Sequence, residues 1–212
     1  MSYPESLSGD TTLELPEFET PPADPIDLLR AWLTSAEAAD VREPRAATLA
    51  TADGDGHVSA RVVLVKEITG DGIVIGISTR SRKGRDITAN PHAALNFYWR
   101  ERAQQISVSG TIAQAESITS DALFAARVRG AQALASRADQ SHPATIADLV
   151  QLRQSVAEAA ADATPIPRPE TWSAWILRPD EIEFWHADAE RFHRRLRYFR
   201  QGDGYRHDRL QP

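Results

Sequence analysis

The segment from Arg191 to Arg197 reads RFHRRLR and is the most strongly basic stretch of the chain. If it forms a β-strand, Arg191, His193, Arg195 and Arg197 share one face. Guanidinium groups bind phosphate or carboxylate through paired hydrogen bonds, and a histidine among them can donate a hydrogen bond or exchange a proton near neutral pH. The pattern predicts an anion site. Two alternatives stay open: a solvated basic edge strand, and a nucleic-acid patch, which the net charge of −6 disfavours.

A second basic group combines Arg61 and Lys66 with Arg82 and Lys83. Arg82 and Lys83 follow Ser81, a good N-cap residue, so they are expected in the first turn of a helix, where free backbone N–H groups favour an anion. Strict alternation puts Arg61 and Lys66 on opposite faces of their strand. One ligand then meets both only through a bulge or through a site shared between subunits. A merely solvated cluster of cations is the alternative.

Two further side chains could contact a flat heterocycle. Gln105 opens an apolar strand, and Trp185 ends another just before the basic segment. Ordinary strand-end and core-packing roles are the alternatives for both. Five of the histidines, namely His57, His92, His142, His186 and His207, show no metal-ligand spacing, so no metal is assigned.

The elements that must position these residues are mainly β-strands. Period-two runs and glycine-rich turns predict strands at Ala46–Thr51, Val58–Lys66, Ile73–Ser78, Ala93–Trp99, Gln105–Ser109, Ser173–Leu177, Glu181–Trp185, Arg191–Arg200 and Tyr205–Leu210. Helical patterns predict helices from Asp24 to about Ala38, and at Ser81–Asn90, Ser117–Arg127 and Thr145–Ala160. Short antiparallel strands with outer helices favour a small β-barrel with peripheral helices, because closure removes exposed sheet edges.

Composition limits the class of protein. The 212 residues include 42% hydrophobic and 25% charged side chains, which is typical of a globular protein. Residues 1–23 are rich in Pro, Glu and Thr and are expected to form a flexible arm, followed by a single domain over residues 24–212. The chain has no cysteine, no signal-like start and no long apolar run, so we expect a cytoplasmic protein without disulfides or a membrane role.

Several short motifs together resemble the pyridoxamine 5′-phosphate oxidase family. They are Arg61 and Lys66, Ser81 to Lys83, Gln105, Gln140 and Ser141, Phe184 and Trp185, Arg191, His193 and Arg195, and the ending Arg209 to Pro212. The resemblance covers about Asp24 to Pro212. Within the family it is strongest to the flavin oxidases of phenazine biosynthesis. The segments that carry this part are Glu5–Gly9, Pro21–Pro25, Val41–Arg45, Tyr98–Glu101 and His193–Tyr198.

The resemblance implies an FMN-binding split β-barrel with Greek-key-like topology, and a homodimer with an FMN in each of two interface clefts. It assigns to the cofactor Arg61, Lys66, Arg82, Lys83, Gln105, Gln140, Ser141, Trp185 and Arg195. Lys66, Arg127, Arg191 and His193 fall on substrate positions, and Arg191 and His193 are the expected catalytic residues. The implied reaction is hydride transfer from a C–H beside a ring nitrogen to flavin N5, with oxygen reduced to hydrogen peroxide.

The implied substrate is a hexahydro- or tetrahydrophenazine carboxylate. Vitamin B6 oxidases have a Tyr and a Ser that bind the substrate phosphate, and these positions are Leu123 and Ala131 here. Each lost partner costs a phosphate roughly 1–3 kcal/mol. The vitamin B6 oxidases also usually have Asp where this chain has Arg194. A pyridoxine or pyridoxamine 5′-phosphate oxidase is the first alternative, and a flavin-binding module without turnover is the second.

Overall fold

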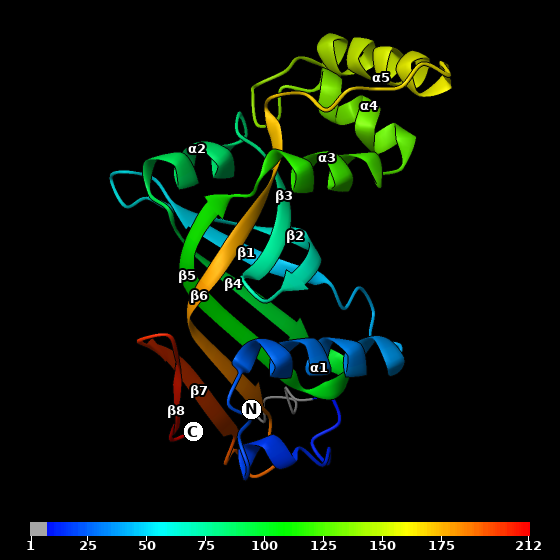
Figure 1. Cartoon of the computed structure of the whole chain (residues 1–212). Coiled ribbons are helices and arrows are strands. Elements are labelled where there is room, and N and C mark those ends of the chain that lie inside the picture. The colour runs from blue at the N-terminus through cyan, green and yellow to red at the C-terminus, as the bar shows by residue number, and fades with distance from the viewer. Residues whose placement is uncertain (1–7) are drawn as a thin grey trace, which may run out of the picture.

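The chain folds into an antiparallel β-barrel with helices on its outside (Figure 1). The computed structural model describes residues 8–212. Its strands are β1 (Ala46–Ala52), β2 (Val58–Thr69), β3 (Gly72–Ser78), β4 (His92–Trp99), β5 (Gln104–Gln114), β6 (Trp172–His186), β7 (Arg194–Gln201) and β8 (Gly204–Arg209). They lie in the order β3-β2-β1-β4-β5-β6-β7-β8, and β3 pairs with β6 to close six of them into a barrel. Because β4 lies beside β1, the first four strands form a Greek key, as expected.

Alternating apolar side chains fill the barrel. Leu49, Ile75, Leu95, Ile106 and Ile182 come from five strands, and each is fully buried. Helix α1 (Pro25–Ala38) begins at Asp24, whose side chain accepts a hydrogen bond from the backbone N–H of Ile26. It packs over one end of the barrel through Trp32, whose ring lies edge-on to Phe184 at 5.1 Å. Period-two and helical spacing therefore predicted the core and its cover correctly.

Strand β6 is longer than the sequence predicts. The two expected strands, Ser173–Leu177 and Glu181–Trp185, form one strand whose first part pairs with β3 and whose last part pairs with β7. Pro179 interrupts the pattern, but its pairing partner β5 shifts register between Ser109 and Gly110. A side chain at Gly110 would overlap the carbonyl of Arg178, so only glycine allows this close approach.

The expected strand Arg191–Arg200 is wrong at its start, because β7 begins only at Arg194. Residues 187–193 form a loop. The Asp188 carboxylate accepts hydrogen bonds from the backbone N–H groups of Glu190 at 2.8 Å and Phe192 at 3.3 Å. Arg191 has a φ of 69°, outside the β region. Arg191 and His193 therefore do not share a strand face with Arg195.

Residues 8–23, named here the N-terminal strap, pack on the barrel. Phe18 is buried, and Arg209 donates a hydrogen bond from Nε to the Phe18 carbonyl at 2.8 Å. The Tyr198 hydroxyl donates to the carbonyl of Pro22 at 2.9 Å. The sequence predicts a flexible arm because apolar residues are few, but here backbone carbonyls accept hydrogen bonds from barrel side chains. Residues 1–7 of the expected arm lie outside the described residues.

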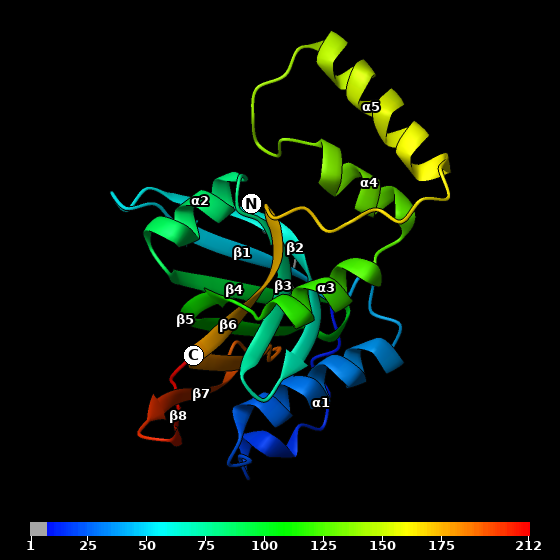
Figure 2. The ribbon, with the colours of Figure 1, turned by 45° about the horizontal axis from the view of Figure 1, so that its top comes forward.

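Four more α-helices lie outside the barrel. They are α2 (Arg82–Ala89), α3 (Ser117–Ala125), α4 (Arg129–Arg137) and α5 (Ile146–Ala161), and short 3-10 turns occur at Pro16–Phe18 and Arg100–Arg102. The sequence predicts α2, α3 and α5. Two of these have local caps: Ser81 at α2, and a capping box of Thr145 and Asp148 at α5. The sequence does not predict α4. The α4 and α5 pair stands away from the barrel (Figure 2). Within the described residues, no helix is long and apolar enough to span a membrane.

Candidate functional site

A cavity of about 660 Å³ lies between β2, β3, α2 and the segment from Ala126 to Gln140, which contains α4. Three basic side chains line it, Lys66, Lys83 and Arg127, and none of its lining residues is acidic. Its apolar wall consists of side chains from both the barrel and α4, namely Val62, Leu64, Val128, Ala131, Leu134 and Trp172. A concave surface with several cations and no carboxylate favours an anionic ligand with an apolar body.

Lys66 and Lys83 are the only lysines in the sequence, and both line this cavity. The pairing of β2 with β3 shifts register between Val65 and Glu67, which is a bulge at Lys66. Burial lowers the pKa of Lys66, and the nearby charge of Arg127 lowers it further. Burial likewise lowers the pKa of Lys83, with a second contribution from Arg61. An anion here would relieve the repulsion among these cations.

Arg61 approaches the same place from inside the barrel. Its guanidinium donates to the Leu49 carbonyl at 3.2 Å and to the Thr51 hydroxyl at 2.7 Å, and it lies 3.8 Å from the Asp86 carboxylate. Burial is the main cause that lowers its pKa, and the charge of Arg82 contributes. Arg61 is absent from the lining of the cavity, although Val63, two positions along the same strand face, contributes to it. Lys83 is near both, because its side chain lines the cavity and the charge of Arg61 contributes to its lowered pKa.

The first turn of α2 has the structure that the sequence predicts. The Ser81 hydroxyl accepts a hydrogen bond from the Gly84 backbone N–H, so Ser81 caps a helix that starts with Arg82 and Lys83. Gly84 lies so close to the backbone of Ser78 and Thr79 that a Cβ would overlap it. The turn is therefore held tightly against the barrel, which fixes where its cations project.

Arg127 has capacity to bind a further group. Its guanidinium lies over the Trp172 ring at 5.0 Å and donates from Nη2 to the Ala131 carbonyl at 3.1 Å. Its Nε is buried and has no hydrogen-bond partner among the described residues. Burial lowers the pKa of Arg127. A buried donor without a partner is unfavourable unless a ligand accepts its hydrogen bond.

Gln140 and Ser141 lie in the loop between α4 and α5. Lys83 donates from Nζ to Gln140 Oε1 at 3.3 Å, which connects this loop to α2. Ser141 adopts a φ of 74°, which is uncommon for a residue with a side chain. The structure thus brings together Lys66, Lys83, Arg127 and Gln140, which the resemblance assigned to the cofactor or to the substrate.

The other predicted residues form a row at the far end of β6. Tyr98, Gln105, Trp185 and Arg195 are successive cross-strand partners on β4, β5, β6 and β7, so their side chains share one face. The ring of His193 lies 4.9 Å from that of Trp185. Tyr98 was not among the expected site residues, but its exposed aromatic ring, 51% accessible, lies next to Gln105 on the neighbouring strand.

The cavity and the row lie at different ends of β6. Trp172, in the wall of the cavity, and Trp185, in the row, lie 13 positions apart on β6. At roughly 3.3 Å per residue this is about 40 Å along the strand. Across the barrel the two are nearer, because Val62 in the cavity wall and Asn96, two residues before Tyr98, both pair with Thr48.

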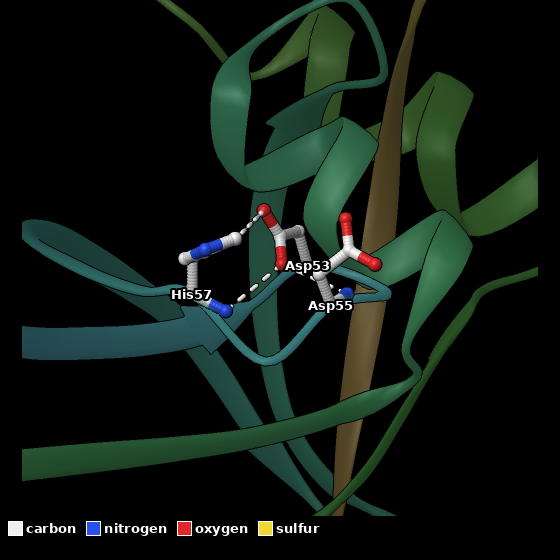
Figure 3. A group of neighbouring side chains, drawn as sticks. All are labelled: Asp53, Asp55 and His57. Carbon is white, nitrogen blue, oxygen red and sulfur yellow. Dashed lines mark hydrogen bonds and ion pairs between the residues drawn. The ribbon is translucent and has the colours of Figure 1, made fainter.

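Asp53, Asp55 and His57 form a third group, in the turn between β1 and β2 (Figure 3). Their ligand atoms lie within 4.8 Å of one another. The Asp53 carboxylate, however, accepts hydrogen bonds from the backbone N–H groups of Asp55 and His57 at 3.0 and 2.9 Å. The backbone N–H of His57 is the main cause that lowers the pKa of Asp53. These bonds account for the group as a turn-stabilising arrangement.

The barrel, its cationic cavity and the aromatic row define a split-barrel protein. The chain belongs to the pyridoxamine 5′-phosphate oxidase family. The family description "Pyridoxamine 5'-phosphate oxidase" matches residues 33–186, and "Pyridoxine 5'-phosphate oxidase C-terminal dimerisation region" matches residues 172–212.

Similar proteins include both branches of this family. The dihydrophenazinedicarboxylate synthase of Pseudomonas chlororaphis is 39% identical over 208 residues, which cover 98% of this chain and 93% of that protein. A pyridoxine/pyridoxamine 5′-phosphate oxidase of Rubrobacter xylanophilus is 42% identical over 189 residues, 89% of this chain and 87% of that protein. Identity alone therefore does not separate the two activities.

Solved structures confirm the fold. The crystal structure of PhzG from Burkholderia lata 383 in complex with tetrahydrophenazine-1-carboxylic acid is 40% identical, with a TM-score of 0.93 and coverage of 96% of this chain and 100% of that one. A pyridoxamine 5′-phosphate oxidase-related, FMN binding protein from Nostoc punctiforme PCC 73102 has a TM-score of 0.72 at 15% identity, with coverage of 96% and 100%. The second likeness concerns the fold alone.

Proposed function

We propose that this protein is an FMN-dependent oxidase that acts on a reduced phenazine carboxylate and uses oxygen as the electron acceptor. The single observation that carries the proposal is the cavity lined by Lys66, Lys83 and Arg127 with no acidic lining residue. Two matches support the phenazine substrate class: the relatives named dihydrophenazinedicarboxylate synthase align over 98% of the chain, and the PhzG complex has a TM-score of 0.93.

The residues fit FMN as an anionic, flat cofactor. Arg61, Arg82 and Lys83 would hold its phosphate at the start of α2, where free backbone N–H groups add to their charge. Trp185, Gln105 and Arg195 offer an aromatic face, an amide and a cation to the ring. Lys66, Gln140 and Ser141 complete the cofactor positions. Bound FMN supplies hydride acceptance and reaction with oxygen, and the protein supplies position and charge.

The two ends of the site would come from two subunits. The chain matches a dimerisation region over residues 172–212, which contains Trp185 and Arg195 of the row but only Trp172 of the cavity wall. Two apolar side chains on the β2 face that lines the cavity are exposed: Val62 is 67% and Leu64 is 53% accessible in the single chain. A two-fold homodimer would bury this face and complete two equal sites.

Lys66, Arg127, Arg191 and His193 are the proposed substrate residues. Arg127 and Lys66 would hold a carboxylate, and Arg127 Nε, which is buried without a partner, would donate to it. His193 Nδ1 accepts a hydrogen bond from the Asp188 backbone N–H at 3.1 Å, which leaves the proton of the neutral ring on Nε2. His193 can therefore donate a hydrogen bond, or pass a proton, from Nε2, and Arg191 beside it would orient the substrate.

Turnover tests the function directly. Purified protein should be yellow, release FMN on denaturation, and consume oxygen with a reduced phenazine carboxylate. A colourless protein that does not bind added FMN would refute the flavin assignment. Bound FMN without oxygen consumption would instead indicate a flavin-binding module, which is the alternative from a different class.

Subunit mixing tests the shared site. Lys83→Ala and Arg195→Ala alter opposite ends of the site, so each variant alone should have little activity. After random reassociation of an equal mixture, half of the dimers are mixed, and each mixed dimer has one intact site. We expect recovery of about a quarter of the wild-type activity. If the mixture stays as inactive as its components, the two ends do not form one site.

A pyridoxine or pyridoxamine 5′-phosphate oxidase is the second candidate. The relative from Rubrobacter xylanophilus is 42% identical, and Lys66 and Arg127 suit a phosphate as well as a carboxylate. Ala131, however, offers no hydroxyl to the cavity that it lines. Comparison of kcat/KM for pyridoxine 5′-phosphate and for a reduced phenazine carboxylate decides between the two substrates.

A further inference from the structure

His186 and Arg194 close the loop that contains Arg191 and His193. His186 is the last residue of β6 and Arg194 the first of β7, and the two are direct cross-strand partners. Arg194 Nη2 donates to His186 Nδ1 at 3.0 Å. The seven residues between them form the loop 187–193, whose two ends this side-chain pair holds together.

The same pair holds the N-terminal strap. Arg194 Nη2 also donates to the Leu13 carbonyl at 2.9 Å, and its guanidinium lies over the Phe18 ring at 5.2 Å. His186 Nε2 donates to the Asp10 carbonyl at 3.1 Å. His186 is fully buried, and Phe18 is buried beside this cluster. One histidine and one arginine thus connect the strap to both ends of the loop.

These contacts require neutral His186 with its proton on Nε2. Only that form can donate to Asp10 and accept from Arg194 at once. Burial lowers the pKa of His186, which keeps the neutral form at neutral pH. The charged groups that face it are Asp10 from the strap, Arg102 from the turn before β5, and Arg194 from β7. Protonation would remove the Nδ1 acceptor and place a cation against the Arg194 guanidinium.

Arg194 itself points away from the proposed substrate. By alternation it shares a face with Leu196 and Tyr198, both fully buried, whereas Arg195 lies on the other face with Trp185. Arg194, where the vitamin B6 oxidases usually have Asp, therefore contacts the strap. Any effect of Arg194 on catalysis must act through the loop.

We propose that His186 and Arg194 form a latch that connects the N-terminal strap to the loop 187–193 and so positions Arg191 and His193 for the substrate. The two latch residues are positioning residues and contact neither substrate nor cofactor. This inference rests on the proposed function for its effect on turnover, but the latch itself can be measured without turnover. It predicts that the strap and the loop loosen together.

Hydrogen–deuterium exchange and kinetics on the FMN-loaded dimer test the latch. Arg194→Ala should increase amide exchange in residues 8–23 and 187–193 together. It should lower kcat/KM by about tenfold to a hundredfold while FMN content is retained, because a misplaced substrate contact reduces turnover. Arg194→Lys keeps one donor and should restore part of both effects. Arg206→Ala, an exposed β8 arginine outside the site, is the matched control for loss of charge.

His186→Gln provides a readout that a structural role alone would not change. Glutamine keeps one acceptor and one donor but does not titrate. In the wild type, strap protection should fall as the pH falls through the lowered pKa of His186, and in His186→Gln it should persist. Unchanged amide exchange in Arg194→Ala would overturn the latch. A loss of turnover that only matches the loss of bound FMN or of folded protein would overturn it as well. A wild type that oxidises no phenazine carboxylate would refute the proposed function, and exchange would still decide on the latch.

Discussion

Arg195 donates two hydrogen bonds to Glu183, from Nε to one carboxylate oxygen at 2.7 Å and from Nη2 to the other at 3.0 Å. The two residues lie on neighbouring strands, β7 and β6, and their side chains are 31% and 16% accessible. These hydrogen bonds are the main cause that raises the pKa of Arg195. The guanidinium proposed to contact the cofactor is thus oriented before any ligand binds.

Glu183→Ala should weaken FMN retention. In the variant the Arg195 guanidinium is free to rotate, so we expect FMN to lose about 1.4 kcal/mol of binding free energy. That loss corresponds to a roughly tenfold higher Kd for FMN. Glu183→Gln keeps one acceptor oxygen and should lose less. Fluorescence titration of the apoprotein with FMN measures the Kd. Equal Kd values for wild type and Glu183→Ala would contradict a preorienting role.

Arg127→Ala should mainly raise the KM for the carboxylated substrate. The change removes a partly buried cation and a donor that lacks a protein partner. Loss of a charge-assisted contact of about 2 to 3 kcal/mol lowers kcat/KM by roughly 30- to 150-fold. Steady-state oxygen consumption gives both constants. Arg153→Ala, on the exposed surface of α5, is the control and should leave both unchanged. An unaltered KM in Arg127→Ala would move the substrate elsewhere.

Substrate affinity should decrease at alkaline pH. Burial and neighbouring cations lower the pKa values of Lys66 and Lys83, so their ammonium groups lose a proton earlier than free lysine as the pH rises. The carboxylate keeps its charge over that range, and its attraction to the cavity weakens. The KM for the carboxylated substrate should therefore rise as the pH increases through this range. In Lys66→Arg the charge persists, and the rise should begin at higher pH; an identical profile in the variant would exclude Lys66 as its cause.

The sequence could predict what depends on local rules. Ser81 caps α2 as expected because an N-cap needs only its own turn, and strand alternation holds for Arg195 because β7 is regular there. The conformation of Arg191 could not be predicted in this way. It depends on the Asp188 carboxylate, which accepts two backbone hydrogen bonds and turns the chain away from the strand.

Which residues meet in the site could not be predicted from local sequence rules either. The cavity requires α4, whose short alanine-rich sequence gave no distinct signal, and it requires the register between β2 and β3 that places the bulge at Lys66. The latch partners His186 and Arg194 are eight positions apart in sequence, but their contact with Asp10 and Leu13 crosses almost the whole chain. Such contacts depend on tertiary structure.

Asp86→Ala should destabilise the fold. Asp86 is buried and accepts hydrogen bonds from the hydroxyls of Thr51 at 2.7 Å and Ser59 at 2.8 Å, beside the Arg61 guanidinium. Removal leaves these donors and a partly buried cation without their acceptor, at a cost of about 3 kcal/mol. Urea denaturation measures the free energy of unfolding. Asp55→Ala, exposed in the β1–β2 turn, should change it by less than about 0.5 kcal/mol. Similar effects of both changes would refute the role of Asp86.

Ala131→Ser should increase activity with pyridoxine 5′-phosphate. Ala131 lines the cavity, and its carbonyl already accepts a hydrogen bond from Arg127, so a serine hydroxyl would project beside the proposed anion position. One added hydrogen bond to a charged group, worth about 1.5 kcal/mol, would lower the KM by roughly tenfold. Leu123→Tyr is the matched comparison, because Leu123 is not among the residues that line the cavity, and alone it should have a smaller effect. Coupled detection of hydrogen peroxide with both substrates measures the change. The opposite result, an improvement by Leu123→Tyr and none by Ala131→Ser, would place the substrate anion close to α3 and away from Arg127. The assignment of Lys66 and Arg127 to the substrate would then need revision.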